Sequence, residues 1–244
     1  MFDTLLSQLP RFATWETVGF FYYAMITTVE MTLIGCVIGF VCAFWLVILR
    51  TTPGWIFLPL RLTMIAFVEF FRRVPFLVLL FLVLFVSKGI GFNFSFFTVA
   101  CISIVFLSTA FIAEIIRAGL ESVPQTQWDA ASAMNFSRIK TLVYVILPQA
   151  WKVIIPPAFA FFVMFIKDSA LASQLGVIEL TAVGKYYNNI GISAILSFGT
   201  VLVLYFVLSY PLTRLGWWLE EWIRRGQTEG GRSNVRMQTA YERM

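Results

Sequence analysis

Three consecutive residues in the second half of the chain combine side chains that could bind a zwitterion. Lys167, Asp168 and Ser169 supply a cation, a carboxylate and a hydroxyl at the end of an apolar run. A lysine can meet a ligand carboxylate and an aspartate can meet a ligand ammonium group through charge-assisted hydrogen bonds. Alternatively, Lys167 and Asp168 neutralise each other at a helix end. The sequence leaves both interpretations open.

Other charged residues lie in or beside apolar sequence. Glu114 and Arg117 have i, i+3 spacing, which allows them to pair on one face of a helix. Arg72 and Arg73 could anchor the chain at lipid phosphates. Glu30 lies inside a long apolar run, where a charge costs roughly 2.5 to 3.5 kcal/mol on insertion scales. Its side chain must therefore face a protein partner, water or the membrane interface.

The composition excludes several kinds of catalytic site. The chain has no histidine, which rules out a histidine-based metal site, triad or proton relay. Cys36, Cys42 and Cys101 lie inside apolar runs and are interpreted as small buried hydrophobic residues, not disulfide partners. The chain also lacks the G-x-x-x-x-G-K-[ST] phosphate loop. We therefore predict that it has no catalytic residue and no metal site, and that it binds no cofactor itself.

The remaining composition is that of an integral membrane protein. Of the 244 residues, 59% are hydrophobic and 13% are charged, which is far from the soluble average. The net charge of +5 could indicate nucleic-acid binding. However, 14 of the 18 Lys and Arg residues fall in three groups, at 50–73, 117–152 and 214–244. This alternation with nearly uncharged segments is the positive-inside signature of cytoplasmic loops.

We predict a single all-α transmembrane domain over residues 1–244, because several apolar runs exceed the roughly 20 residues that span a bilayer. The predicted helices cover residues 20–49, 56–87, 96–117, 149–167 and 193–222. The second of these begins outside the inner face of the membrane and is kinked near Pro75. Residues 1–19 form an amphipathic segment on the outer side, and residues 226–244 form a mobile tail. Five crossings place the N-terminus outside and the C-terminus in the cytoplasm.

The long polar interruption at residues 118–148 is predicted to be a cytoplasmic loop with two short helices. Ser122 and Gln125 have capping-box spacing for the first helix, and the second can start at Ser137. Asn135, between the two, tolerates the left-handed conformation that a helix–turn–helix joint often needs. Two short helices with small alanine side chains are suited to a groove on another protein.

The core of this loop resembles the EAA loop of the membrane subunits of bacterial ABC importers. That family pattern is Glu-Ala-Ala, three residues, Gly, about nine residues, and Ile-x-Leu-Pro. The matching residues here are Asp129-Ala130-Ala131, Asn135 and Val145-Ile146-Leu147-Pro148. Asp replaces the family's Glu, Asn its Gly and Val its Ile. The resemblance implies a type I ABC importer permease fold with a cytoplasmic coupling helix. It also implies that Asp129, Ala130, Ala131, Asn135 and Pro148 serve in coupling to an ATPase.

Two further segments resemble the histidine-permease-like group of amino-acid importer permeases. Residues 67–80 resemble its Phe-Arg-x-x-Pro segment, which implies that Arg72 belongs to the lower translocation path. The segment from Lys167 to Leu171 resembles its Lys-Asp/Asn-Ser/Thr-Ser-Leu motif, with Ala170 in place of the second hydroxyl. The substrate-path candidates are Arg72, Glu114, Lys167, Asp168 and Ser169.

The resemblance implies a set of partners in a bacterial inner membrane. They are two ABC ATPase subunits that hold ATP and Mg, a second permease chain that is identical or homologous, and a periplasmic solute-binding protein. The implied substrate is a polar amino acid. Glutamate or aspartate is favoured because residues 167–173 resemble the exit segment of their permeases and the chain is basic. Basic or neutral amino acids and opine-like derivatives stay open. We also expect Ala131→Arg to abolish transport by displacing the coupling helix from its groove.

Two other function classes are weighed against this interpretation. A membrane-embedded enzyme is disfavoured because the chain lacks catalytic groups. An ATP-independent channel or secondary carrier would need its own driving-force coupling, and the sequence has neither a repeat pair nor a gating-charge array.

Overall fold

The structure, a computed structural model, describes the backbone of residues 2–51 and 54–241 and the side chains of residues 6–50 and 54–223. Within these ranges the secondary structure is helical, without strands. This confirms the predicted all-α class. The α-helices are α1 (Phe2–Phe12), α2 (Trp15–Thr51), α3 (Leu58–Phe71), α4 (Phe76–Gly89), α5 (Phe96–Glu121), α6 (Gln125–Ala133), α7 (Arg138–Thr141), α8 (Leu147–Asp168), α9 (Leu180–Asn189) and α10 (Ala194–Tyr241).

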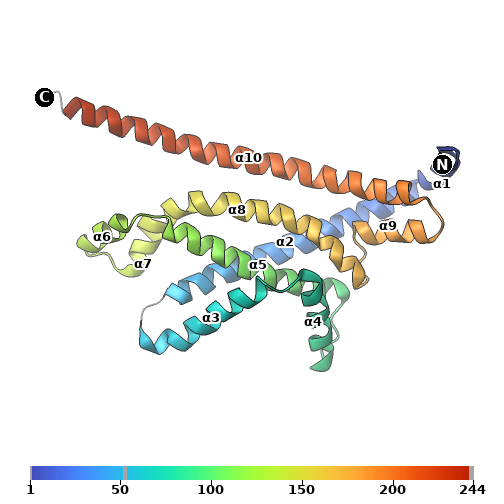
Figure 1. The fold of residues 1–244 in the computed structure, drawn as a ribbon, viewed down its shortest axis with the longest axis horizontal. Helices are drawn as coiled ribbons and strands as arrows, with labels where there is room; N and C mark the ends of the chain where they lie inside the picture. The colour runs from blue at the N-terminus through green and yellow to red at the C-terminus, as the bar shows by residue number, and fades with distance from the viewer. Residues whose placement is uncertain (1, 52–53, 242–244) are drawn as a thin grey trace.

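Four helical segments of the described chain are long and apolar enough to cross a membrane, and a bent pair makes up to five. The four cover Trp15–Arg50, Phe96–Glu121, Arg138–Gln174 and Ala194–Ile223. In Figure 1, α6 and α7 lie at one end of the elongated molecule, α1 and α9 lie at the other, and α10 runs along its length. The loop that contains α6 and α7 therefore lies at one end of the long axis, beyond the apolar spans.

The second predicted helix, residues 56–87, bends near Pro75 as predicted, but far more sharply than a kinked helix does. It is a pair of helices, Trp55–Phe71 and Phe76–Gly89, that meet at an angle of 118°. Pro75 is extended (φ −60°, ψ 137°) and is the N-cap residue of α4. Proline has no N–H to continue α3 and disfavours helical geometry in the residue before it, so the chain starts a new helix in a new direction.

The start of the fourth span contains a wider helical turn. Residues Leu142–Ile146 form a π-helix, in which the N–H of Leu147 donates to the carbonyl of Leu142. Pro148 follows at the start of α8. A proline has no N–H to donate to the preceding helical turn. A π turn contains one extra residue and so lets the helix continue past this missing hydrogen bond. Pro156 and Pro157 lie inside α8.

The packing core lies between α2 and α5, with α4 and α8 against them. Gly35 and Gly39, four residues apart on α2, face α5 so closely that a Cβ atom at Gly39 would lie 1.8 Å from Ser108 Oγ. The hydroxyl of Ser108 donates to the carbonyl of Gly35 at 3.1 Å. Small residues with this spacing let two helix backbones approach closely, which is how membrane helices gain packing energy in lipid. Gly35 and Gly39 therefore set the distance between the two central spans.

At the ends of the chain the helices are longer than the sequence predicts. α10 continues to Tyr241, so residues 226–241, predicted as a mobile tail, are helical, and residues 242–244 lie outside the described chain. α1 folds against the α9–α10 turn. The Gln8 amide donates to the carbonyl of Gly191 at 3.2 Å and accepts from the N–H of Ser193 at 2.8 Å.

Candidate functional site

The predicted EAA-like loop forms a helical hairpin of α6 and α7. Asn135 turns the chain between the two helices with a φ of 58°, the only positive φ of a non-glycine residue in the described chain. This confirms the predicted left-handed joint. Ser137 is the N-cap of α7, and its Oγ accepts from the N–H of Lys140 at 3.4 Å. The predicted start of the second helix is therefore confirmed as well.

The predicted capping box before α6 is wrong. The Ser122 hydroxyl donates to the carbonyl of Gly119 at 2.7 Å, so it caps the end of α5. Pro124 is the N-cap residue of α6 and no side chain caps this helix. The amide of Gln125 instead donates to Asp129 at 3.2 Å, one turn on. Because α5 extends to Glu121, Ser122 is needed at its C-terminus and is not available to α6.

The residues of the Asp-Ala-Ala triplet face different ways. Asp129 and Ala130 are exposed, whereas only 3% of the Ala131 surface is exposed, because Ala131 packs against its own chain. An arginine at position 131 would first break the packing of α6 inside the loop. Pro148 is exposed at the start of α8.

The surface of the hairpin carries apolar side chains that the sequence analysis did not single out. Met134, Ile139 and Tyr144 are 68%, 76% and 72% exposed. Between α6 and α7 lies a hollow of about 520 Å³, whose walls include Trp128, Asp129 and Arg138. Exposed apolar residues rimmed by polar groups are typical of a protein-binding surface. The signal in the sequence is that large apolar residues, Met134, Ile139 and Tyr144 among them, are interspersed with the polar residues of the loop.

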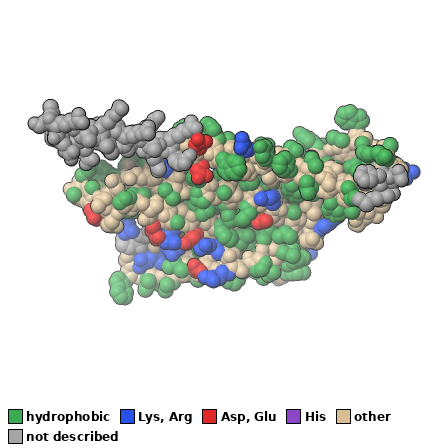
Figure 2. Space-filling view, turned by 45° about the horizontal axis from the view of Figure 1, so that its top comes forward, with side chains coloured by type: hydrophobic (Ala, Val, Ile, Leu, Met, Phe, Trp, Pro, Cys, Tyr) green, Lys and Arg blue, Asp and Glu red, His purple; other side chains and the backbone are tan. Residues whose placement is uncertain are grey.

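A second cluster gathers charges near the C-terminal ends of α2, α3 and α5. The Arg117 side chain donates to both oxygens of Glu114 at 3.1 Å, which confirms the predicted pair, and to Glu121. Arg50 and Arg72 approach the same Glu114 carboxylate at 4.0 and 3.9 Å. Figure 2 shows basic and acidic side chains intermingled on one part of a mostly hydrophobic face. The structure therefore brings Arg72 and Glu114 together, with more positive than negative charge around them.

Glu114→Gln is expected to destabilise the folded chain by about 1 to 3 kcal/mol, because three guanidinium groups would lose their shared carboxylate in a half-buried site. The measurement is the thermal unfolding midpoint in detergent. The control is Glu69→Gln, since the Glu69–Arg73 pair is largely exposed and should contribute less than about 1 kcal/mol. Equal midpoints for the two variants would contradict this account of the cluster.

The other candidate residues lie at the C-terminal end of α8, towards the α9 end of the molecule (Figure 1). Phe111 packs on Phe161 with ring centroids 4.7 Å apart. Glu114 follows Phe111 by three residues on α5, and Lys167 follows Phe161 by six residues on α8. Because the two helices run in opposite directions, about nine helical residues, roughly 14 Å along the axis, separate Glu114 from Lys167 (Figure 1). Lys167 is exposed, Asp168 is half-buried, and the buried Ser169 hydroxyl donates to the carbonyl of Ile166 at 2.7 Å. The five candidates therefore form two groups, and the three adjacent residues face different surroundings.

A buried carboxylate that the sequence analysis did not single out lies beyond this segment. Glu179 is fully buried at the N-cap of α9. It accepts from the backbone N–H groups of Thr181 and Ala182 at 2.9 and 2.8 Å, and from the Tyr205 hydroxyl at 2.7 Å. The N–H of the next residue, Leu180, donates to the hydroxyl of Thr28 at 3.4 Å. Glu179 thus joins α9 to α10 where the chain also contacts α2.

The stability of this region should depend on pH. Burial raises the pKa of the Glu179 carboxyl above its ordinary value of 4.5, although its hydrogen bonds oppose the shift. The folded state then holds a proton that the unfolded state releases. The stability that protonated Glu179 adds to the folded state is therefore complete below pH 4.5 and is lost as the pH rises through the folded pKa. In Glu179→Gln the unfolding midpoint should fall less between acid and neutral pH than in the unaltered chain. Parallel pH profiles would refute this expectation.

Among the described side chains, no group of three or more His, Cys, Asp or Glu residues is placed to hold a metal ion. The arrangement consists of exposed apolar side chains on the hairpin at one end and polar groups within and beside apolar spans.

Comparisons with known proteins identify the family. Residues 35–225 match the family of binding-protein-dependent transport system inner membrane components. The chain is 30% identical to the probable glutamine ABC transporter permease protein GlnM of Bacillus subtilis, over 79% of this chain and 86% of that protein. It is 27% identical to the glutamate/aspartate import permease protein GltJ of Escherichia coli K12, over 93% of this chain and 96% of that protein.

Solved structures of ABC transporters are also similar to this chain. A crystal structure of an amino acid ABC transporter with histidines matches with a TM-score of 0.79 and 26% identity, over 89% of this chain and 97% of that chain. An inward-facing structure of the MetNI methionine ABC transporter matches with a TM-score of 0.73 and 25% identity, over 86% and 99% of the two chains. These matches confirm the type I permease fold. The chain belongs to the family of inner-membrane permease components of binding-protein-dependent transport systems.

Proposed function

We propose that this permease is half of the membrane path of an ATP-driven importer of polar amino acids, and that it couples to ATPase subunits through the α6–α7 hairpin. The observation that carries the proposal is the hairpin itself, in which Asn135 joins two short helices and Met134, Ile139 and Tyr144 are exposed around them. An ATPase groove that covers these side chains would remove apolar surface from water, which favours docking.

The proposed partners supply what this chain does not have, namely an ATP-binding site and enough spans to enclose a path. Its sequence has no phosphate loop, so ATP and Mg belong to two partner ATPase subunits. Four or five spans are too few to enclose a path comfortably, which favours a second permease chain, identical or homologous. A solute-binding protein would deliver substrate at the outer side. The chain itself then carries no catalytic residue and needs no cofactor.

The orientation rests on charge. The hairpin carries Arg138 and Lys140, and the inner ends of α2 and α3 carry Arg50, Arg72 and Arg73. This concentration of basic residues favours the cytoplasmic side of a bacterial inner membrane. The N-terminus then lies outside and the C-terminus inside. In this arrangement Asp129 and Ala130 face the ATPase, whereas Ala131, Asn135 and Pro148 shape the hairpin.

The proposed path includes both groups of candidate residues. Arg72 and Glu114 would line its inner part, and Lys167, Asp168 and Ser169 would lie near its outer part. The proposed substrate class is supported by relatives named for glutamine and for glutamate/aspartate. Within that class, an acidic amino acid is the first candidate because the chain is basic and Lys167 is exposed.

The test is uptake in proteoliposomes that hold the permease, its co-purified ATPase and its binding protein. L-glutamine and L-glutamate are offered in radiolabelled form with and without internal ATP. The proposal expects accumulation of at least one of them only with ATP and the binding protein. Uptake by the permease alone, without ATP, would show an independent channel or secondary carrier instead.

A further inference from the structure

The inference concerns the N-terminal helix α1, which neither the coupling hairpin nor the proposed path uses. α1 ends at Phe12, and α2 begins at Trp15. The hydroxyl of Thr14 accepts from the N–H of Thr17 at 3.2 Å, which caps the start of α2 and separates the two helices. In Figure 1, α1 is seen nearly end-on at the α9 end of the molecule, whereas α2 runs in the plane of the view. α1 therefore crosses the direction of the spans and does not extend the first of them.

One side of α1 is packed against the rest of the chain. Gln8 is hydrogen-bonded to two backbone groups of the turn between α9 and α10. The buried ring of Phe12 lies 6.0 Å from the ring of Phe21 on α2 and 5.3 Å from that of Tyr187 on α9, measured between centroids. These contacts fix α1 beside the α9–α10 turn.

The remaining surface of α1 is divided into an apolar side and a polar side. Leu6 and Leu9, three residues apart, are 64% and 42% exposed, and Pro10 is exposed beside them. Ser7 and Arg11 are exposed about 100° further around the helix. A helix with leucine on one side and arginine on the other is typical of segments that lie in the plane of a membrane interface.

The length of α10 shows at what depth α1 lies. Trp217 and Trp218 are both 60% exposed, and exposed tryptophans of a span mark a membrane interface. From Trp217 back to Ala194, the first residue of α10, the chain rises by about 35 Å. The hydrocarbon core is about 30 Å thick, or about 40 to 45 Å with both headgroup layers. The α9–α10 turn therefore lies in the opposite headgroup layer, and so does α1, because Gln8 binds this turn.

The residues that follow α1 have the character of an interface as well. Trp15 is 91% exposed, and Val18 and Tyr22, three and seven residues later, are exposed on the same side of α2. Tryptophan and tyrosine are enriched where a span meets the headgroups. The medium around this end of the molecule is therefore lipid headgroups and the upper part of the acyl chains.

We propose that α1 is a membrane-surface helix whose partner is lipid, with Leu6 and Leu9 against the upper acyl chains and Arg11 among the lipid phosphates. Burial in lipid removes the two leucine side chains from water, and a guanidinium group forms charge-assisted hydrogen bonds with phosphate. Through Gln8, α1 then holds the α9–α10 turn at the membrane surface. Only the choice of the outer leaflet rests on the proposed function, which sets the orientation of the chain.

The test places a fluorescent reporter on each side of α1. The assembled transporter is held in nanodiscs of phosphatidylethanolamine and phosphatidylglycerol, with the three native cysteines replaced by alanine. An NBD dye, whose emission depends on polarity, is attached to Leu6→Cys, Leu9→Cys or Ser7→Cys. We expect emission at shorter wavelength from positions 6 and 9 than from position 7, and quenching by a lipid that carries a nitroxide near the top of its acyl chain. Ser7→Cys is the matched control, because it has the same depth on another side of the helix.

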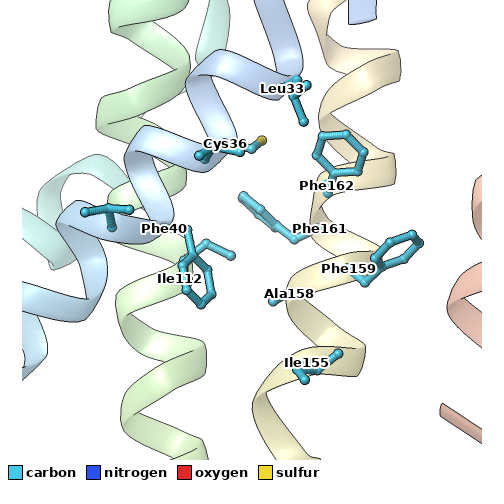
Figure 3. A pocket seen from close by; sticks show the side chains of 11 residues that line it. Leu33, Cys36, Phe40, Ile112, Ile155, Ala158, Phe159, Phe161 and Phe162 are labelled. Carbon is cyan, nitrogen blue, oxygen red and sulfur yellow. The ribbon is translucent and has the colours of Figure 1, made fainter. Parts of the chain in front are cut away.

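Leu33→Cys provides a reference for depth. Leu33 is 49% exposed and lines the apolar hollow of about 400 Å³ between α2, α5 and α8 (Figure 3). It follows Trp15 by 18 residues, roughly 27 Å along the helix axis. A nitroxide near the end of the acyl chain should quench the dye at Leu33 more than one near the headgroup, and the dye at Leu6 should show the reverse order. The same order at both positions would contradict the depth of α1.

A second variant tests whether the apolar side holds the helix in lipid. With the dye at position 6, Leu9→Asp should lower the ratio of lipid-embedded to water-exposed dye about 10-fold or more, because one leucine side chain loses its burial. The ratio is measured by quenching with aqueous iodide. Leu9→Met, which keeps an apolar side chain of similar size, is the control and should leave the ratio unchanged.

Two results would overturn the inference. One is a dye at positions 6 and 9 that iodide quenches and lipid nitroxides do not. The other is a dye that leaves water only when the solute-binding protein is added, which would make this side a protein-docking surface. A membrane-impermeant maleimide should label Ser7→Cys in intact spheroplasts. Labelling only in inverted vesicles would reject the proposed orientation, whereas ATP-driven uptake with a water-exposed dye would reject the lipid contact alone.

Discussion

Gly39→Leu is expected to prevent accumulation of the folded permease. A Cβ atom at this position would lie 1.8 Å from Ser108 Oγ and 3.1 Å from the backbone nitrogen of Thr109. The serine side chain could rotate away, but the backbone of α5 could not, so the two central spans would have to separate. Overpacking of a well-packed core costs about 1 to 3 kcal/mol, and a whole leucine against a backbone should exceed that range. The measurements are the monodisperse yield in detergent and the thermal unfolding midpoint.

Gly19→Leu is the matched control. Gly19 lies on the same helix, and a Cβ atom there meets nothing within 4 Å. Since glycine in a helix interior is less favourable than other residues by up to about 1 kcal/mol, this variant should be at least as stable as the unaltered chain. Normal yield and stability of Gly39→Leu would show that α2 and α5 do not pack as the structure describes.

Ile139→Asp is expected to abolish recovery of an ATPase subunit with the permease. Ile139 is 76% exposed on α7, beside the joint at Asn135, so the substitution does not disturb the core of the chain. In a docked complex it would replace buried apolar surface with a desolvated charge. The lost burial of the isoleucine side chain and the desolvation of the aspartate together cost about 3 kcal/mol or more of docking free energy. This corresponds to a docking affinity at least roughly 100-fold weaker. Stoichiometry after affinity purification measures this.

Ile190→Asp provides the comparison. Ile190 is also an exposed isoleucine, but it follows α9 at the opposite end of the molecule from the hairpin. This variant should retain its ATPase. If both variants keep it, the exposed apolar residues of the hairpin are not the docking surface.

The sequence was sufficient for features that depend on local chemistry. Apolar run lengths predicted the spans, the i, i+3 spacing predicted the pair of Glu114 and Arg117, and the conformational tolerance of Asn135 predicted the joint of the hairpin. The N-cap at Ser137 follows from the same kind of local rule. Each of these features involves residues within one or two helical turns of one another.

Features that depend on contacts between distant segments were not predicted. The inward direction of Ala131 follows from how α6 rests on its own chain, and the approach of Arg50 and Arg72 to Glu114 requires three helices to converge. Pro75 predicted the position of the bend, but its angle of 118° depends on how α4 packs against the other helices. One signal was present but unused, because Gly35 and Gly39 form a G-x-x-x-G pattern typical of closely packed membrane helices.

The most direct test of the account is affinity purification of the solubilised permease from membranes of its native host, followed by identification of the proteins recovered with it. We expect to recover an ABC ATPase subunit and a second permease chain, with the ATPase lost in Ile139→Asp and kept in Ile190→Asp. A stable homo-oligomer that recovers no ATPase under any condition and transports without ATP would contradict it.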